Sequence, residues 1–248
     1  MLLPQVPEFI KILGLTLIDF DDFTRGPSST VYNHLALDTT ATVTNSDAVG
    51  GWAKLTTDVT ANNEAAIYSK KCLLFAQDKP FYFQTRVRWT EAGTDNLALF
   101  AGVSSAFGVN LVQDGGLLMA ASHSGAGFFK AKDTTVWKTH TSKSTTQTTS
   151  TTESTASGSA QANTLGVYCS PIDATNATLS FYIDTAGGEN LMPIRVASTN
   201  ARVTDLASNQ VLVAISSAAA MSYGLYAKCG GESETPEVDY FALFGVRT

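Results

Sequence analysis

The sequence predicts an all-β protein, a sandwich or barrel of antiparallel strands. Between Phe81 and Trp89, aromatic, threonine and valine side chains at every second position alternate with Tyr82, Gln84 and two arginines. This two-residue period is typical of a half-buried strand. Turn signals such as the Asp-Gly-Gly of 114–116 recur along the chain, and β-branched residues and glycine interrupt nearly every stretch long enough for three helical turns. Short strands separated by such turns indicate a sandwich or barrel.

The strands are expected at short intervals, each bounded by turn residues. In chain order we expect them at 65–69, 81–89, 97–103, 108–112, 117–121, 127–131, 134–139, 165–169, 177–183, 194–197, 210–216, 222–227 and 238–246. Glycines in the turns supply the positive φ angles that tight reversals need. Only 7–17 and 205–208 are candidates for a helix.

Residues 139–163 differ from the rest of the chain. They are nearly all Ser, Thr, Gln, Ala and Gly, without a large apolar side chain to hold them against a core. Two alternatives are open for this segment. It is a long surface excursion of the domain, or it is an extended hairpin with both faces in water, which β-branched threonine tolerates well.

The first 18 residues form a hydrophobic arm in front of a domain that we expect to span 19–248. Such a segment must be buried, since an exposed apolar patch of this size would aggregate. It is buried on its own domain or in a neighbouring subunit, and both alternatives are open. The residues expected at an assembly interface are Phe9, Ile10, Ile12, Leu13 and Leu15.

Composition limits the classes of function. The chain has 248 residues, 44% of them apolar and 15% charged, which fits one large domain with a full core. Its net charge of -6 disfavours a nucleic-acid partner. No apolar stretch is long enough for a membrane helix, and the start lacks the pattern of a secretory signal. The three cysteines are widely spaced, so we expect buried free thiols.

The sequence predicts neither catalytic residues nor a metal or cofactor. His34, His123 and His140 are not spaced as metal ligands, and Ser122–Ser124 is expected to be a polar turn. A hydrolase nucleophile elbow is absent. Glu237 shares a strand face with the carboxylate two residues on, but Phe241 stands where a third acidic residue would follow.

Tryptophan is the residue type most suited to binding a sugar here, because an exposed aromatic ring complements the apolar face of a pyranose. The chain has Trp52, Trp89 and Trp137. Alternation places Trp89 in the core. Trp137 and Trp52 therefore remain as the candidates for contact with a glycan.

Four segments together resemble concanavalin A-like jelly rolls of the laminin-G or lectin type. They are the Ile-Asp-Phe-Asp-Asp-Phe of 18–23, the strand 81–89, the Leu-Ser-Phe-Tyr-Ile-Asp of 179–184 and the Val-Asp-Tyr-Phe of 238–241. The resemblance covers 18–248 and implies two curved antiparallel sheets packed face to face. Lectins, glycosidases, adhesion modules and virion proteins share this fold. The Glu-x-Asp-x-x-Glu motif of its hydrolases is absent.

The arm, the unpaired cysteine count and the Thr/Ser-rich, charge-poor composition are similar to those of tailed-phage structural proteins that carry this jelly roll. The resemblance implies a non-enzymatic virion protein made in the host cytoplasm, a decoration or cement protein on the outside of the head. Its partners would be the major capsid protein or other virion proteins, and we expect a homo-oligomer. The alternative is a carbohydrate-binding or receptor-binding module of a tail fibre or adhesion protein, with a glycan as ligand.

Overall fold

The structure is a computed structural model. It describes residues 14–36, 41–46, 51–70, 73–74, 79–91, 96–155, 161–173, 176–184, 192–193, 210–214 and 220–246. Within these ranges every regular element is a β-strand, which confirms the predicted class. The same ranges contain no helix with the length and apolar character needed to cross a membrane.

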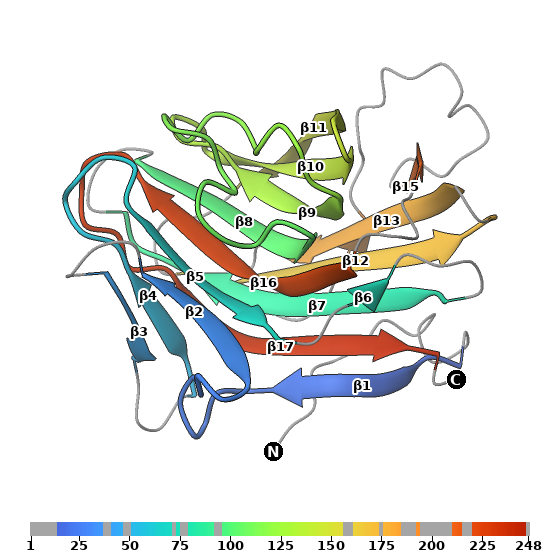
Figure 1. The fold of residues 1–248 in the computed structure, drawn as a ribbon, viewed down its shortest axis with the longest axis horizontal. Helices are drawn as coiled ribbons and strands as arrows, with labels where there is room; N and C mark the ends of the chain where they lie inside the picture. Colours follow the sequence, from blue (N-terminus) through green and yellow to red (C-terminus); the bar gives the residue numbers. More distant parts are fainter. Residues whose placement is uncertain are drawn as a thin grey trace.

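The strands form two antiparallel sheets (Figure 1). The first sheet has the order β14-β13-β12-β7-β17-β4-β3, with β1 beside β17 and β15 beside β13. Its strands are β1 (Thr16–Asp21), β3 (Thr42–Asn45), β4 (Ala53–Thr56), β7 (Phe81–Arg88), β12 (Asn163–Pro171), β13 (Asn176–Asp184), β14 (Met192–Pro193), β15 (Gln210–Ala214) and β17 (Glu237–Gly245).

The second sheet has the order β11-β10-β9-β8-β16-β5-β2, with β6 beside β16. Its strands are β2 (Tyr32–Ala36), β5 (Glu64–Ser69), β6 (Leu73–Leu74), β8 (Leu97–Ser104), β9 (Gly125–Lys130), β10 (Val136–Lys143), β11 (Thr146–Thr155) and β16 (Ala220–Cys229). The predicted jelly-roll sandwich of two antiparallel sheets is therefore confirmed.

The main core lies between the two sheets. On β7, Phe81, Phe83 and Val87 face inward, as the alternation predicts. Burial of each such side chain contributes roughly 1.5–3 kcal/mol. Trp89 lies edge-on to Trp137, with ring centroids 5.6 Å apart. The alternating apolar positions thus form one continuous layer between the sheets.

A second apolar layer covers the outer face of the second sheet. The loop 105–124, between β8 and β9, packs Leu111, Val112 and Met119 against Phe100 and Tyr226 of this face. The predicted strands 108–112 and 117–121 both fall in this loop. Neither forms a strand, because the loop is held by side-chain packing and its ladder is a single bridge between Val112 and Met119.

Most of the segment 139–163 is a hairpin. β10 and β11 pair antiparallel, with His140 opposite Thr149, and β12 begins at Asn163. This corresponds to the second alternative, with one difference: Thr139–Ser142 are buried. The hairpin therefore does not have both faces in water, because the end of the loop 105–124 packs on this part of β10.

The start of the described chain is part of the sandwich. β1 begins at Thr16, two residues before the expected end of the arm, and Thr16 pairs with Gly245 of β17. In Figure 1 the two strands run side by side, and the end of β17 lies beside the start of β1. Leu15 packs against Tyr82 and Tyr240 on the outer face of the first sheet. Phe9, Ile10, Ile12 and Leu13 lie outside the described residues.

Candidate functional site

A buried ion pair lies beneath the loop 105–124. Along β16, Leu225 and Ala227 face the core, so Tyr226 and Lys228 point to the outer face. Lys228 pairs in register with Glu64 of β5, and its Nζ lies 2.8 Å from Glu64 Oε1. Both side chains are 0% exposed. A buried charge is tolerated when an opposite charge and hydrogen bonds satisfy it.

The loop supplies the remaining partners of the ammonium group. Lys228 Nζ lies 3.0 Å from Asn110 Oδ1, 2.9 Å from the Val112 carbonyl oxygen and 2.8 Å from Asp114 Oδ1. The Asn110 backbone N–H donates to both Glu64 carboxylate oxygens, at 3.0 and 2.9 Å. We call these five residues the Lys228 cluster. It fastens the near half of the loop to β5 and β16.

The solvent side of the cluster carries polar and apolar groups together. The Asp114 side chain is 73% exposed although one of its oxygens is held by Lys228. Leu117 and Leu118 are 52% and 63% exposed, and Asn110 is also exposed. The Gly115 N–H donates to Asn62 Oδ1 at 2.8 Å, which fixes the turn that follows Asp114. A fixed carboxylate and amide beside apolar side chains suit a ligand with hydroxyl groups and an apolar face.

The surroundings of the cluster keep a nearby phenol neutral. Burial, followed by the charge of Glu64, raises the pKa of Tyr226 well above its usual range. Tyr226 is therefore a protonated, apolar-packed side chain of the second layer. It contributes no charge to this end of the sheet.

The far half of the loop is tied to the β10–β11 hairpin by two histidines. His123 and His140 stack with ring centroids 5.0 Å apart, and their Nε2 atoms are 3.0 Å apart. His123 Nδ1 lies 3.0 Å from the Ala120 carbonyl oxygen, and His140 Nδ1 lies 2.9 Å from Thr149 Oγ1. The Ser142 hydroxyl donates to the His123 carbonyl oxygen at 2.6 Å. Both imidazoles are buried, whereas the sequence predicts a polar turn at Ser122–Ser124.

Three glycines form one row across the middle of the second sheet. Gly224, Gly102 and Gly127 pair in register on β16, β8 and β9, and the row ends at His140. A Cβ at any of the three glycines would overlap a backbone oxygen of the neighbouring strand. The strands can approach this closely only because the row has no side chains.

Neither tryptophan proposed for glycan contact has a face open to a ligand. Trp137 is 0% exposed, and its Nε1–H donates to Asn163 Oδ1 at 3.3 Å. Trp52 is 8% exposed, and the Arg88 guanidinium carbon lies 3.9 Å from the centre of its ring. The predicted glycan contacts are therefore wrong for both residues, since one ring fills the core and an arginine covers the other.

The carboxylates, described cysteines and His34 considered in the sequence analysis lie in ion pairs or are buried at least in part. Glu237 pairs with Arg88 at 2.5 Å and Asp239 with Arg86 at 3.2 Å, so an arginine engages each carboxylate. Cys169 and Cys229 are buried free thiols, as predicted, and Cys72 lies outside the described residues. His34 lies on β2 at partial burial, and burial lowers its pKa.

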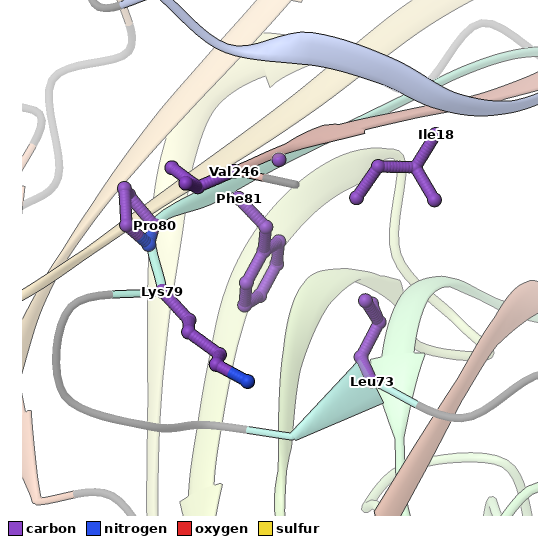
Figure 2. A pocket seen from close by; sticks show the side chains of 7 residues that line it. Ile18, Leu73, Lys79, Pro80, Phe81 and Val246 are labelled. Atoms are coloured by element: carbon purple, nitrogen blue, oxygen red, sulfur yellow. The ribbon is translucent and has the colours of Figure 1, made fainter. Parts of the chain in front are cut away.

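A cavity of about 210 Å³ opens between the sheets (Figure 2). Ile18, Leu73 and Phe81 line it, with Lys79 and Val246 beside them. Leu73 pairs with Met221 at the start of β16, seven residues from Lys228. At about 3.3 Å per residue the cavity and the Lys228 cluster are roughly 23 Å apart along the strand. They are separate features, and the cavity is mostly apolar.

No member of the Lys228 cluster was predicted as a site residue from the sequence. One signal was available: Lys228 and Glu64 are single charged residues within otherwise apolar strand patterns, Tyr-Gly-Leu-Tyr-Ala-Lys-Cys and Glu-Ala-Ala-Ile-Tyr. A charge in such a strand needs a buried partner. The contribution of Asn110 and Asp114 has no such signal, because it depends on the path of the loop.

Comparison of the fold gives clear neighbours among solved structures. The lumenal domain of VIP36 in a form bound to Ca²⁺ and Man3GlcNAc matches with a TM-score of 0.56 and 11% identity, over 94% of this chain and 91% of that one. Peanut lectin matches with a TM-score of 0.59 and 10% identity, over 94% and 99%. The fold is that of the concanavalin A-like lectins. No family model and no curated protein sequence matches the chain.

One further neighbour has the same fold without a described role. It is a protein of unknown function, SO2946 from Shewanella oneidensis MR-1, with a TM-score of 0.53 and 12% identity over 98% of this chain and 97% of that one. At such identities the comparisons establish the fold alone. What these lectin-like proteins bind is therefore a guide to a proposal for this chain.

The VIP36 structure contains calcium, whereas the described residues of this chain do not fit a metal ion. The described ranges contain no group of three or more His, Cys, Asp or Glu side chains that could hold one. The oxygens of Glu64, Asn110, Val112 and Asp114 do converge, but the Lys228 ammonium fills the space between them. This oxygen cluster does not fit a metal ion.

Proposed function

We propose that the protein is a carbohydrate-binding module that binds a glycan at the loop 105–124, on the solvent side of the Lys228 cluster. The observation that carries this proposal is the Asp114 carboxylate, held by an ammonium at 2.8 Å and yet 73% exposed. The lectin-like neighbours, VIP36 and peanut lectin among them, support the class of ligand.

The chemistry of the loop fits a sugar. Each sugar hydroxyl both donates and accepts a hydrogen bond, and here a carboxylate acceptor lies close to the Asn110 amide, both held by Lys228. Holding both groups in advance reduces the ordering cost of binding. The exposed Leu117 and Leu118 offer apolar contact to the C–H face of a pyranose ring.

We propose that the protein binds the glycan without cleaving it. Glycoside cleavage needs two carboxylates facing each other across the bond. In the described loop Asp114 is an exposed carboxylate, whereas Glu64 is fully buried and held by Lys228 and Asn110. These two groups cannot serve as an acid and nucleophile pair. The lectin neighbours agree with a binding protein.

Glycan-array screening followed by calorimetric titration of the best ligand tests the proposal. Asp114→Asn removes one charge and one acceptor from the site, and we expect a loss of affinity of roughly tenfold or more. Asp22→Asn is the matched control, because its amide oxygen can still accept the Thr24 N–H. The control should bind like the wild type. Absence of glycan binding, or equal losses in both variants, would overturn the proposal.

The role in phage-head decoration, the virion location and the capsid partners remain predictions from the sequence. The neighbours found by comparison offer no support for them. Glycan binding is therefore the function that we propose, and the assembly arm stays a separate prediction from the sequence.

A further inference from the structure

We propose that the Lys228 ammonium is a built-in cation that organises the loop 105–124, so that this loop, and glycan binding at it, need no divalent metal ion. The consequence for glycan binding rests on the proposed function. The organisation of the loop by Lys228 is independent of it and is tested independently.

The geometry around Nζ suits an ammonium group. Four oxygens lie 2.8–3.0 Å from it, and they come from β5 and from three positions of the loop. These are hydrogen-bond distances to an ammonium group. A calcium ion would need six to eight oxygens at about 2.3–2.6 Å. The distances therefore suit an ammonium group, whose three N–H donors are shared among the four oxygens, and the oxygens are too few for calcium.

The charges of the cluster also favour an ammonium group in its interior. Glu64 is fully buried and would be strongly destabilising without a cation. Lys228 balances Glu64 inside the protein, while the second carboxylate, Asp114, is exposed to water. The cluster thus needs one positive charge in its interior, and Lys228 supplies it from the adjacent strand. An additional divalent ion has no space there, and the remaining negative charge, on Asp114, is solvated by water.

The cluster holds the loop at residues 110, 112 and 114. Asn110 has a φ of 60°, which is a left-handed conformation, and its N–H and side chain are both bound by the Glu64–Lys228 pair. The Val112 carbonyl and the Asp114 carboxylate follow at two-residue intervals on the same ammonium. Lys228 therefore fixes the backbone from 110 to 114, which presents the residues of the proposed glycan site.

Amide hydrogen exchange on the full chain tests this inference. In the wild type, we expect the protection of amides 110–116 to be the same in excess EDTA and in millimolar CaCl2. In Lys228→Met, exchange of these amides should accelerate by roughly tenfold or more, while amides of β7 and β12 change less. Lys143→Met is the matched control on the same sheet and should leave the loop amides unchanged.

A double variant covers the case in which Lys228→Met does not fold. Lys228→Met with Glu64→Gln leaves no unpaired buried charge, so it should fold, yet Asn110, Val112 and Asp114 still lose their donor. We expect fast exchange in its loop. Wild-type protection that falls in EDTA, or normal loop protection in the double variant, would overturn the inference.

Glycan titration separates this inference from the proposed function. Affinity that is unchanged by EDTA supports both. Loss of affinity in EDTA overturns the metal-independence of the site. If the array finds no glycan, the proposed function fails, and the exchange results alone decide whether Lys228 organises the loop.

Discussion

The Nε2 atoms of His123 and His140 lie 3.0 Å apart in a buried stack, so one ring must donate a hydrogen bond to the other. The Ala120 carbonyl can only accept, which places a proton on His123 Nδ1. His123 Nε2 is then the acceptor and His140 Nε2–H the donor. His140 Nδ1 in turn accepts from the Thr149 hydroxyl. The two rings cannot both be charged, because only one proton fits between the Nε2 atoms, and burial, which lowers the pKa of each ring, favours the neutral form of both.

Acid should therefore loosen the attachment of the loop to the hairpin. Burial lowers the pKa of both rings, and with the added effect of His123 it lowers the pKa of His140 to about 3. The unfolded histidines titrate near 6.5. The unfolded state thus binds more protons below that pH, and stability falls as the pH decreases, by up to about 1.4 kcal/mol per pH unit for each histidine.

Thermal unfolding between pH 7.5 and pH 4 measures this effect. The stability of the wild type should be flat above about pH 6.5 and decrease below it. In His140→Gln the decrease should be smaller, because one depressed histidine is gone. His34→Gln should retain most of the acid response, since its ring lies outside this pair. An equal acid response in wild type and His140→Gln would contradict the assignment.

Trp137→Phe should destabilise the protein. The smaller ring leaves space in the core beside Trp89, and Asn163 Oδ1 loses its donor. We expect the free energy of unfolding to fall by about 1–3 kcal/mol in urea titrations. Glycan affinity should be unchanged, since Trp137 is not at the proposed site. A variant of wild-type stability with weakened glycan binding would contradict the buried position.

Gly102→Ala should be more damaging than its size suggests. The added Cβ overlaps the Ala126 carbonyl oxygen and the Gly127 Cα on β9, and because both of these are backbone atoms, neither can move away cheaply. We expect a loss of roughly 1–3 kcal/mol. Ser104→Ala, on the same strand, is the control and should cost about 1 kcal/mol or less. Equal costs in urea titrations would show that the strands can separate at this row.

The predicted assembly arm can be tested by deleting residues 2–13, which leaves β1 intact. If the arm mediates assembly, light scattering will give an oligomer for the full chain and a folded monomer for the deletion. Co-sedimentation with assembled capsids should be lost in parallel. Identical masses and no capsid binding by either form would rule out the decoration role.

The sandwich itself could be predicted from the sequence, because its strands bury alternate residues. Phe81, Phe83 and Val87 lie inward on β7 as the pattern indicates. The strands expected at 108–112 and 117–121 were wrong for a physical reason. Their apolar residues, Leu111, Val112 and Met119, are buried by a loop that lies on a sheet, and a local pattern cannot distinguish this from strand pairing.

The candidate site could not be predicted, because its parts meet only through the register of the sheet and the path of the loop. Lys228 and Glu64 are 164 residues apart in sequence. Trp137 was misjudged for a related reason. Its neighbours on the inward face of β10 are polar, Thr139 and Thr141, so nothing in the local sequence marks that face as buried.

The pairing of β1 with β17 delays completion of the first sheet during synthesis. β17 lies between β7 and β4 and is also the partner of β1, although Thr16 and Gly245 are 229 residues apart. During synthesis β1 cannot form the pairing described here until β17 has left the ribosome. Pairings of such long range are slow to form, and unpaired strand edges are prone to aggregate. Until β17 has been synthesised, β1 is therefore an unpaired strand that can aggregate.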